Sequence, residues 1–360
     1  MNGHAAILME AGGALVHRAV QFDAPMPREV LIRVAACGVC HSDLLGIEGG
    51  IPAPVPCALG HEAAGVVEAV GADVHDLAVG DHVVTCLSGF CGHCAECLSG
   101  HPNRCERPPA NRPEGAPPRI RLADGDGRAV GQFLWLGAFA SHVLVDRAYM
   151  VRVRPEMPLA AAALIGCAVT TGVGAVFRTA RVEPGATVAV IGCGGVGLAA
   201  VNGAALAGAS RVIAIDVTAA KLDLASAMGA TDVVRADEGN PVEQVRELTR
   251  GGVHYSFEAV GRKATFEQAF HMLRGGGLAT LIGILPHDAK IEILGNALLN
   301  ERRTGGSLMG SNQFQTDVPR YVELYLQGRL HLGRMVSRTL PLESDSSCLN
   351  RCGIPKWRGF

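Results

Sequence analysis

Over the first 85 residues, apolar and polar positions alternate in short stretches, which is the period of half-buried strands. Val30, Ile32 and Val34 show this alternation within residues 29–36. Gly and Pro separate the stretches, and no long helical period appears between them. The pattern predicts an irregular all-β domain. Its predicted strands are 5–9, 29–36, 64–70 and 82–86.

The pattern changes near residue 186, where near-continuous apolar runs begin to alternate with helical segments. Strands buried on both faces lack the alternation of half-buried strands, and right-handed crossovers place helices on both faces of such a sheet. We therefore predict an α/β domain with a parallel sheet. Its predicted strands are 187–191, 211–215, 232–235, 255–259 and 278–284, and its predicted helices are 195–207, 219–228, 241–250 and 263–273.

The segments outside these two patterns are less regular. Residues 106–131 are rich in Pro, Gly and Arg, which favours a surface loop over a partner-binding segment. Residues 137–145 are predicted to resume regular structure, and small residues predict a helix over 160–175. Towards the C-terminus, 318–327 has a helical period and 335–340 an extended one.

Composition narrows the class of protein. A chain of 360 residues is too long for one ordinary core, which supports two domains. Its 32 basic and 34 acidic residues nearly cancel, so no nucleic-acid partner is expected. The N-terminus lacks a signal-peptide pattern, and no apolar run approaches the length of a membrane span. We expect a cytoplasmic protein without a membrane partner.

Four of the twelve cysteines lie close together in a CxxCxxCx7C pattern. In a large chain without secretory features, clustered cysteines bind metal or do chemistry more often than they form disulfides. Four thiolates at this spacing can surround one Zn²⁺ and leave no position for substrate, which predicts a structural zinc. Four unligated thiols in one polar loop would be prone to oxidation. The four are Cys91, Cys94, Cys97 and Cys105.

A second candidate metal site begins at Cys40 and His61, each of which has a carboxylate nearby, at Asp43 and Glu62. Thiolate and imidazole are transition-metal ligands, and a carboxylate can orient the imidazole. Two ligands alone do not define a site, because a lone buried Cys or His more often belongs to the core. Cys167, at the entry to the α/β domain, offers a third.

A glycine-rich turn joins the predicted strand 187–191 to the predicted helix 195–207. With 46 glycines in the chain, GxGxxG alone is weak evidence, but this strand–turn–helix context is what dinucleotide binding requires. The glycines allow a pyrophosphate to approach the helix N-terminus, whose free N–H groups favour anions. The residues of this turn are Gly192, Gly194, Gly195, Val196 and Gly197.

Asp216 ends the next predicted strand and can accept hydrogen bonds from both adenosine ribose hydroxyls. A 2′-phosphate would meet this carboxylate and no adjacent arginine, since Val217 and Thr218 follow. The sequence therefore favours NAD over NADP. Lys221 is placed to reach the same ribose, although a solvated helix lysine is nearly as good an interpretation.

These motifs, in this order and spacing, resemble the zinc-dependent medium-chain alcohol dehydrogenases over roughly residues 5–340. The central loop and residues 306–310 are most similar to the class III-like, actinobacterial-type alcohol and thiol-linked formaldehyde dehydrogenases. The resemblance implies an α/β plus β architecture. It implies a GroES-like catalytic domain at 1–168 with a zinc lobe at 88–106, a doubly wound Rossmann NAD-binding domain at 169–308, and a return to the catalytic domain at 309–360.

The resemblance also implies roles for the site residues. Cys40, His61 and Cys167 would bind a catalytic zinc and the four clustered cysteines a structural zinc, with Glu62 able to approach the metal and Asp43 orienting His61. Ser42 would bond the substrate oxygen and pass its proton toward the cofactor ribose, and Thr171 would lie against the nicotinamide. Two positions depart from the family. His41 replaces an arginine that often contacts the pyrophosphate, and Leu45 replaces a histidine of the proton relay.

The expected activity is hydride transfer between a primary alcohol, or its aldehyde, and NAD. One alternative is a formaldehyde dehydrogenase acting on the adduct with a low-molecular-weight thiol. A catalytically silent dinucleotide sensor is a further alternative, against which the intact ligand set argues. By resemblance the chain is expected to form a homo-oligomer, a dimer or a tetramer, of which the long loop after Cys105 favours the dimer. Residues 344–360 lack the terminal helix and strand of the family, which predicts reduced stability or altered cofactor release.

Overall fold

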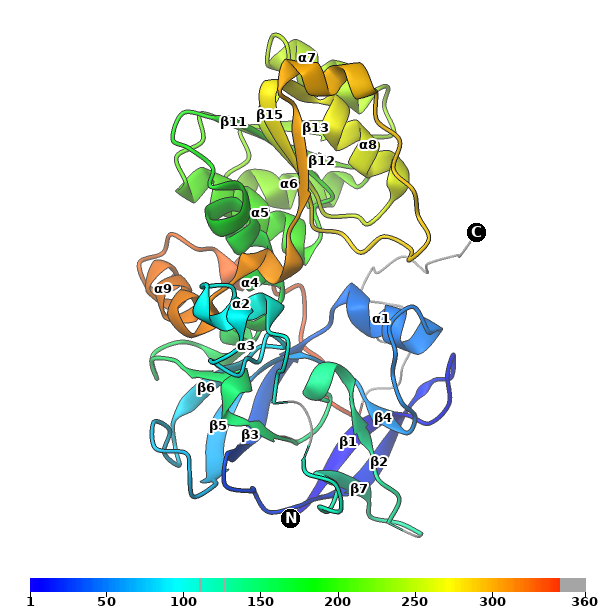
Figure 1. The fold of residues 1–360 in the computed structure, drawn as a ribbon, viewed down its shortest axis with the longest axis vertical. Helices are drawn as coiled ribbons and strands as arrows, with labels where there is room; N and C mark the ends of the chain where they lie inside the picture. Colours follow the sequence, from blue (N-terminus) through cyan, green and yellow to red (C-terminus); the bar gives the residue numbers. More distant parts are fainter. Residues whose placement is uncertain (110–111, 126, 344–360) are drawn as a thin grey trace. The chain divides into compact units, whose positions relative to one another are not determined.

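The computed structural model describes residues 1–109, 112–125 and 127–343, and the chain divides into two compact units (Figure 1). The first unit contains Met1–Cys167 and Phe314–Glu323 and continues from Val336. The second contains Ala168–Gln313 and Leu324–Met335. The atypical tail at 344–360 lies outside the described residues.

Two five-stranded sheets form the first unit. One has the order β7-β2-β1-β4-β8 and the other β10-β6-β5-β3-β9. Every pair of neighbouring strands is antiparallel except β4 and β8. The strands are β1 (Asn2–Leu8), β2 (Leu15–Phe22), β3 (Glu29–Gly38), β4 (Cys57–Ala58), β5 (Glu62–Val70), β6 (His82–Thr85), β7 (Ile120–Leu122), β8 (Gly131–Gln132), β9 (His142–Asp146) and β10 (Met150–Arg152).

Strand β3 is buried on both of its faces near its start. Val30 and Ile32 enter one hydrophobic core, with Val143 and Val145 of β9. Leu31 enters a second core, with Ile7 and Phe22 among others. Because successive side chains of a strand point to opposite faces, one strand contributes to both cores.

Helices and 3-10 turns complete the first unit, so the prediction of an all-β domain was wrong in this detail. Helix α1 begins directly after Cys40, because the Asp43 side chain accepts a hydrogen bond from the Cys40 N–H at 2.9 Å and caps the first turn. The elements are α1 (His41–Glu48), α2 (Ala95–Leu98), η1 (Pro102–Arg104), η2 (Phe133–Trp135), η3 (Arg147–Tyr149), α3 (Leu159–Ala163), η4 (Leu164–Gly166) and the first part of α9 (Phe314–Leu326).

The continuous helix predicted over 160–175 is interrupted at Cys167. This residue has φ −136° and ψ −69°, outside the helical region, between η4 and α4 (Ala168–Gly174). Beyond α4 the chain continues as the π-helical turn η5 (Ala175–Ala180). Small residues on both sides of the break gave little sequence signal for it.

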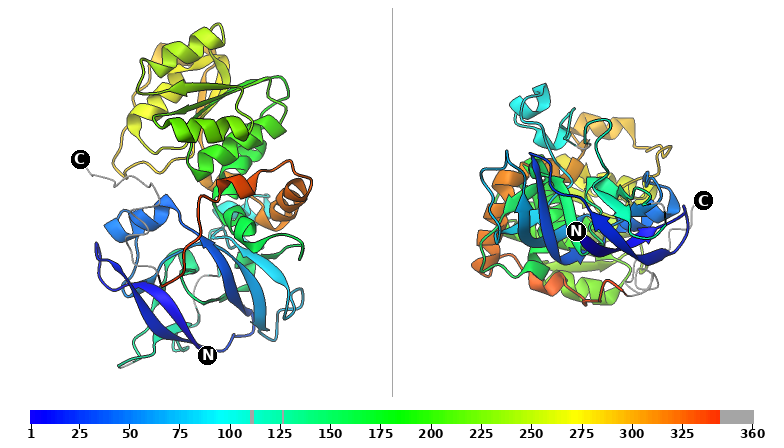
Figure 2. Two further views of the ribbon diagram at one scale, coloured as in Figure 1. Left: turned by 180° about the vertical axis from the view of Figure 1, so that it is seen from behind. Right: turned by 90° about the horizontal axis from the view of Figure 1, so that it is seen from below.

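The second unit contains the predicted parallel sheet, which Figure 2 shows from behind. Its strand order is β13-β12-β11-β14-β15-β16. This is the strand order of a doubly wound dinucleotide-binding fold, so the predicted fold class is confirmed. The strands are β11 (Thr187–Ile191), β12 (Arg211–Asp216), β13 (Asp232–Arg235), β14 (Val253–Glu258), β15 (Leu273–Leu281) and β16 (Arg303–Gly306), the last of which was not predicted.

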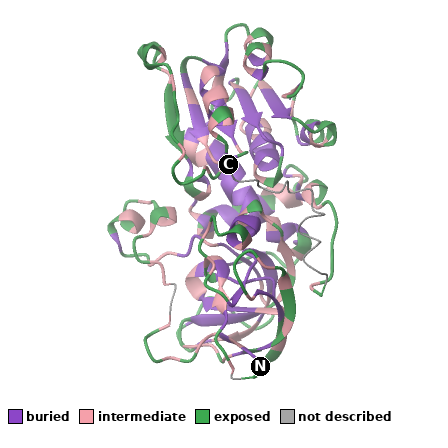
Figure 3. Cartoon of the chain, turned by 90° about the vertical axis from the view of Figure 1, so that its right-hand side faces the viewer, coloured by how far each residue is buried: buried purple, intermediate pink, exposed green. Residues whose placement is uncertain are grey.

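Both faces of this sheet are covered, and its central strands β11, β12 and β14 are largely buried (Figure 3). Val188 and Val190 of β11 pack in the core that includes α5 and α6 side chains, whereas Ala189 and Ile191 pack in the core that includes α7 and α8. Besides α4, η5 and the end of α9, the helices of this unit are α5 (Gly195–Leu206), α6 (Ala219–Ala227), α7 (Pro241–Leu248), α8 (Lys263–His271), η6 (Gly295–Asn300), η7 (Leu308–Ser311) and α10 (Leu332–Met335).

Two extended predictions differ from the structure. Residues 137–141 form a loop before β9, and residues 336–340 form no strand.

Among the described residues, no single helix is long and apolar enough to cross a membrane, although the bent pair Leu159–Gly166 and Ala168–Ala180 passes that test by length and composition alone.

The segment predicted as a surface loop is fastened to the first unit by a buried arginine. The Arg112 side chain is 7% exposed and pairs with Asp23 at 2.6 Å and with Glu29 at 2.5 Å. Arg119 adds a contact to Glu29 at 2.7 Å. Burial raises the pKa of Glu29, but hydrogen bonds from Arg112, Met26 N–H and Arg119 outweigh it and hold the pKa below its ordinary value.

Candidate metal centres and nucleotide turn

Four donor side chains meet in the first unit. Cys40, His61, Glu62 and Cys167 each offer one ligand atom, and these atoms lie within 4.8 Å of one another. Cys40 precedes α1, Glu62 begins β5, and Cys167 occupies the break after η4. The structure thus brings together residues that are far apart in the sequence, in a mixed sulfur, nitrogen and oxygen donor set that suits zinc.

The imidazole of His61 is fixed by Asp43. Nδ1 of His61 lies 3.3 Å from Asp43 Oδ1, and both side chains are fully buried. Asp43 also accepts hydrogen bonds from the N–H groups of Gly60 at 3.0 Å and Cys40 at 2.9 Å. Nε2 of His61 is buried and has no hydrogen-bond partner among the residues that the structure describes. A buried polar atom without a partner is costly, and a metal ion would satisfy it.

The thiols of this set influence each other's protonation. The hydrogen bond from Cys167 is the largest cause that holds the pKa of Cys40 well below its ordinary value. Burial raises this pKa, and the neighbouring His61 imidazole lowers it further. The same contact raises the pKa of Cys167 well above its ordinary value. The site therefore favours a thiolate at Cys40, which is the form that binds a metal.

Replacing Asp43 with Asn is expected to weaken zinc binding at this set by about 10–100-fold. Asn keeps the size of Asp, but one of its two polar atoms is an N–H₂ group, which cannot accept a hydrogen bond from the Cys40 N–H, the Gly60 N–H or His61 Nδ1. The measurement is competition for zinc with a graded series of chelators. Asp81→Asn is the matched control, since Asp81 caps a turn at the Ala78 N–H away from the cluster. Unchanged zinc affinity in Asp43→Asn would contradict the orienting role.

Three further predicted residues belong to α1. The Oγ atom of Ser42 lies 3.6 Å from Cys40 Sγ, beside the donor set. His41 is the exposed first residue of the helix. Leu45 is 7% exposed and has no polar side-chain atom, so the side chain one turn after His41 offers no step for a proton.

The four clustered cysteines form a second donor set, within 4.8 Å. Cys94 Sγ lies 3.4 Å from Cys97 and 3.9 Å from Cys105. A tetrahedron with Zn–S bonds of about 2.3 Å has S–S edges of about 3.8 Å, so the spacing fits zinc. Backbone N–H groups point at the sulfurs, and those of Cys97 and Glu106 lower the pKa of Cys94 to about 6. Cys91 completes this set.

The glycine-rich turn lies at the carboxyl end of β11 in the second unit. Gly192 has φ +93°, which disfavours any side chain, and a Cβ on Gly197 would lie 1.7 Å from the Gly192 carbonyl oxygen. Around Gly194 there is open space, and a Cβ on Gly195 would make only ordinary contact. Val196 lies in the first turn of α5. The turn therefore combines close helix–strand packing with free approach to the helix N-terminus.

Asp216 ends β12 beside this turn. Its carboxylate accepts hydrogen bonds from the N–H groups of Cys193 at 2.8 Å and Thr218 at 2.9 Å. Lys221, in the first turn of α6, makes no ion pair with Asp216. Thr171 lies in α4 and donates a hydrogen bond to Met309 Sδ at 3.5 Å.

One charged residue near Asp216 was missed by the sequence analysis. Arg235 ends β13 and is the register partner of Asp216 on β12. The two are neighbours only across strands, so the residues that follow Asp216 in the sequence gave no sign of an arginine. A pattern-based search would need the strand pairing to find it.

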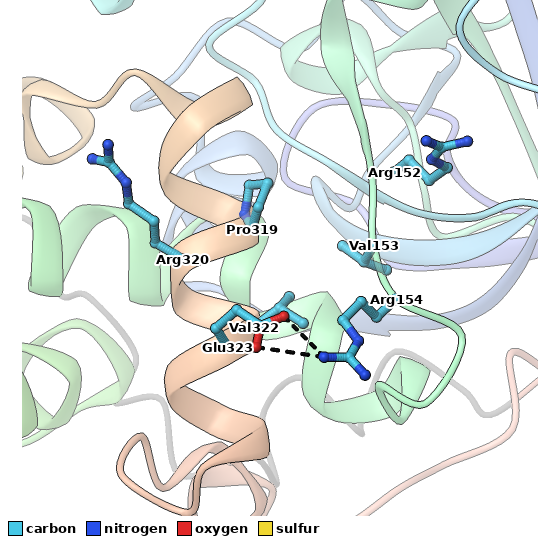
Figure 4. Close-up of a pocket in the computed structure, with 7 residues that line it drawn as sticks. All are labelled: Arg152, Val153, Arg154, Pro319, Arg320, Val322 and Glu323. Carbon is cyan, nitrogen blue, oxygen red and sulfur yellow. Dashed lines mark hydrogen bonds and ion pairs between the residues drawn. The ribbon is translucent and has the colours of Figure 1, made fainter.

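A surface cavity of about 220 Å³ lies elsewhere in the first unit, between the end of β10 and α9 (Figure 4). Arg154 pairs across it with Glu323 at 3.1 Å, and none of the predicted site residues lines it. The guanidinium groups of Arg152 and Arg320 point away from each other, so the cavity offers no converging cationic site. Its lining residues are Arg152, Val153, Arg154, Pro319, Arg320, Val322 and Glu323.

Comparison with known proteins places these sites in context. Residues 26–155 match the family described as "Alcohol dehydrogenase GroES-like domain", and residues 195–326 match "Zinc-binding dehydrogenase". The chain is 36% identical to "Alcohol dehydrogenase-like 1" of Arabidopsis thaliana, over 93% of this chain and 89% of that protein. It is 35% identical to "S-(hydroxymethyl)glutathione dehydrogenase" of Synechocystis sp., over 95% and 94%.

A solved structure is similar over nearly the whole chain. The "Alcohol dehydrogenase zinc-binding domain protein" from Burkholderia ambifaria superposes with a TM-score of 0.91 and 36% sequence identity. The match covers 98% of this chain and 95% of that one.

Proposed function

Because the chain belongs to the zinc-dependent medium-chain alcohol dehydrogenases, and is thus a zinc-dependent alcohol oxidoreductase with a nicotinamide cofactor, we propose roles for its residues. Cys40, His61 and Cys167 hold the catalytic zinc, with Glu62 as an alternative ligand. Cys91, Cys94, Cys97 and Cys105 hold a structural zinc. The observation that carries the proposal is the buried Nε2 of His61, which lies in a set of two thiols and a carboxylate and has no hydrogen-bond partner in the described part of the chain.

The bound groups supply Lewis acidity toward the substrate oxygen and a hydride acceptor. The protein's part is to position these groups and to move a proton. The Ser42 hydroxyl, beside Cys40, accepts the substrate proton as it releases its own. Since Leu45 is apolar, the proton continues from Ser42 through water rather than through a side chain at that position.

The second unit binds the cofactor, and NAD is the preferred form. The glycine turn from Gly192 to Gly197 receives the pyrophosphate, and the Asp216 carboxylate accepts hydrogen bonds from the ribose hydroxyls. A 2′-phosphate would meet that carboxylate and be repelled. Thr171 lies near the nicotinamide, His41 contacts the pyrophosphate with a weaker charge than arginine, and Lys221 reaches the ribose.

The substrate is a primary alcohol or the matching aldehyde. The similarity to an S-(hydroxymethyl)glutathione dehydrogenase supports a second candidate, the adduct of formaldehyde with a small thiol. A panel of alcohols and aldehydes with NAD and NADP, and of formaldehyde with and without glutathione or other small thiols, separates the two. Turnover of simple alcohols without thiol supports the first, and turnover of formaldehyde only with thiol supports the second. A protein that binds NAD but turns over none of these, and holds one zinc per chain, would be the dinucleotide sensor.

We also propose that the chain forms a homodimer in the cytoplasm. Strand β16 is an edge of the parallel sheet and is exposed along its whole length, as are Leu298, Leu299 and Leu308 near it. An open edge with apolar neighbours is a surface that a second copy can cover. Sedimentation of the assayed preparation gives the mass, and a monomer would contradict the proposal.

A further inference from the structure

Arg235 bears on the choice between NAD and NADP, which rests on the NAD preference proposed above. In the parallel sheet, Arg235 is the partner of Asp216 across β12 and β13, and the Ala236 N–H donates to the Asp216 carbonyl at 3.1 Å. Register partners on adjacent strands are about 4.8 Å apart and point to the same face. An arginine therefore stands beside the carboxylate that is expected to bind the adenosine ribose.

The side chains of Arg235 and Asp216 do not form an ion pair with each other. The two oxygens of Asp216 are occupied by the N–H groups of Cys193 and Thr218. The Arg235 guanidinium is held by Asp237, with Nε at 2.9 Å from Oδ1 and Nη2 at 2.6 Å from Oδ2, a bidentate contact. Its third nitrogen lies 3.5 Å from Glu238 Oε1.

We propose that Asp237 and Glu238 contribute to the preference for NAD by holding the Arg235 guanidinium away from the adenosine ribose. Arg235 is the candidate residue for binding a 2′-phosphate, and these two carboxylates neutralise its charge. Arginine binds phosphate through the same planar pair of N–H groups that Asp237 now occupies. A 2′-phosphate must therefore compete with Asp237 and Glu238 for Arg235, in addition to facing Asp216. The two carboxylates are positioning groups, because they act through Arg235 and need not touch the cofactor.

The ion pair is partly exposed, with side-chain exposures of 31% for Arg235 and 47% for Asp237. Exposed pairs contribute little, so releasing Arg235 is expected to have a moderate effect. The double variant Asp237→Asn with Glu238→Gln should lower the ratio Kd(NADP)/Kd(NAD) by about fivefold. Arg235→Gln alone should change this ratio by less than twofold, because the arginine is already withheld.

The decisive variant combines all three substitutions. If Arg235 carries the effect, the triple variant returns to the wild-type ratio, as a thermodynamic cycle requires. Asp232→Asn is the matched control, since Asp232 pairs with Arg211 at 3.2 Å at the opposite end of the same two strands and should leave the ratio unchanged. Binding is measured by titration calorimetry with NAD and NADP, so no turnover is needed.

The outcomes separate this inference from the proposed function. A wild-type ratio below one would overturn the NAD preference, whatever the variants do. A fivefold gain that survives removal of Arg235 would overturn the present inference, because the two carboxylates would then act only by general repulsion. A large rise in the ratio for Arg235→Gln alone would also overturn it, since Arg235 would already bind the phosphate.

Discussion

Replacing Cys167 with Ser is expected to lower kcat by about 10³-fold or more while leaving NAD affinity within about twofold. Serine has nearly the same size, but its hydroxyl does not form the soft anionic ligand that zinc prefers. Cys167 belongs to the donor set of the first unit, whereas the glycine turn that receives the cofactor belongs to the second. Zinc per chain should fall from two to one, measured by metal analysis beside the kinetic assay.

The matched control is Cys57→Ser. Cys57 is also fully buried in the first unit, and it belongs to neither donor set. Its Sγ donates only to the neighbouring Ala58 carbonyl at 3.6 Å, which a serine hydroxyl can replace. This variant should keep both zinc ions and its activity. If Cys167→Ser retained full zinc content and turnover, the assignment of Cys167 as a ligand would be wrong.

Replacing Arg112 with Ala is expected to destabilise the first unit by about 3–5 kcal/mol, because it leaves the buried Glu29 carboxylate without its main partner. The Glu29 side chain is 4% exposed, and Arg119 and the Met26 N–H would remain as its partners among the described residues. Thermal and urea unfolding followed by a signal from the first unit measure the change. Arg104→Ala is the control, since its pair with Glu96 is exposed and should contribute under 1 kcal/mol. Equal effects in the two variants would contradict the argument.

The same network predicts how stability depends on pH. The folded-state pKa of Glu29 is below its ordinary value of 4.5, so the unfolded chain takes up protons first as the pH falls. The stabilisation by Glu29 is therefore complete above pH 4.5 and is lost as the pH drops below that value through the folded-state pKa. In Arg112→Ala the pKa of Glu29 should rise, and this part of the acid dependence should shrink. Urea titrations across pH 3 to 6 provide the test.

The parallel sheet was predictable because its central strands, β11, β12 and β14, are largely buried on both faces. Residues 187–191 coincide with β11, where a continuous apolar run bounded by turns leaves little choice of register. Residues 232–235 coincide with β13, although only Val234 of this strand is buried. The edge strand β16 has the sequence Arg-Thr-Gly-Gly and is exposed throughout, so no hydrophobic pattern predicts it. Helix α1 was missed for a related reason. It is short, and its start depends on a cap from Asp43 rather than on an apolar period.

The candidate sites also divide into those that the sequence predicts by local spacing and those that only the folded chain brings together. The four-cysteine set is local in sequence, so spacing alone indicated a metal. The second metal set is spread over most of the sequence of the first unit. Neither composition nor periodicity indicates that Cys40, His61 and Cys167 belong to one site, so that grouping depended on the family resemblance. Arg235 and Arg112 were not singled out at all, because their partners are set by strand pairing or by a distant loop. A basic residue in a polar stretch reads as a solvated side chain until its contacts are known.

Strand β3 has a consequence for how the first unit loses its structure. Val30 and Ile32 belong to one core and Leu31 to the other, and β9 is divided in the same way by Val143 and Leu144. Neither core can open without withdrawing side chains from a strand that the other core also holds. The two sheets should therefore melt together in one cooperative transition, and amide protons of β3 and β9 should exchange with solvent only when both cores open.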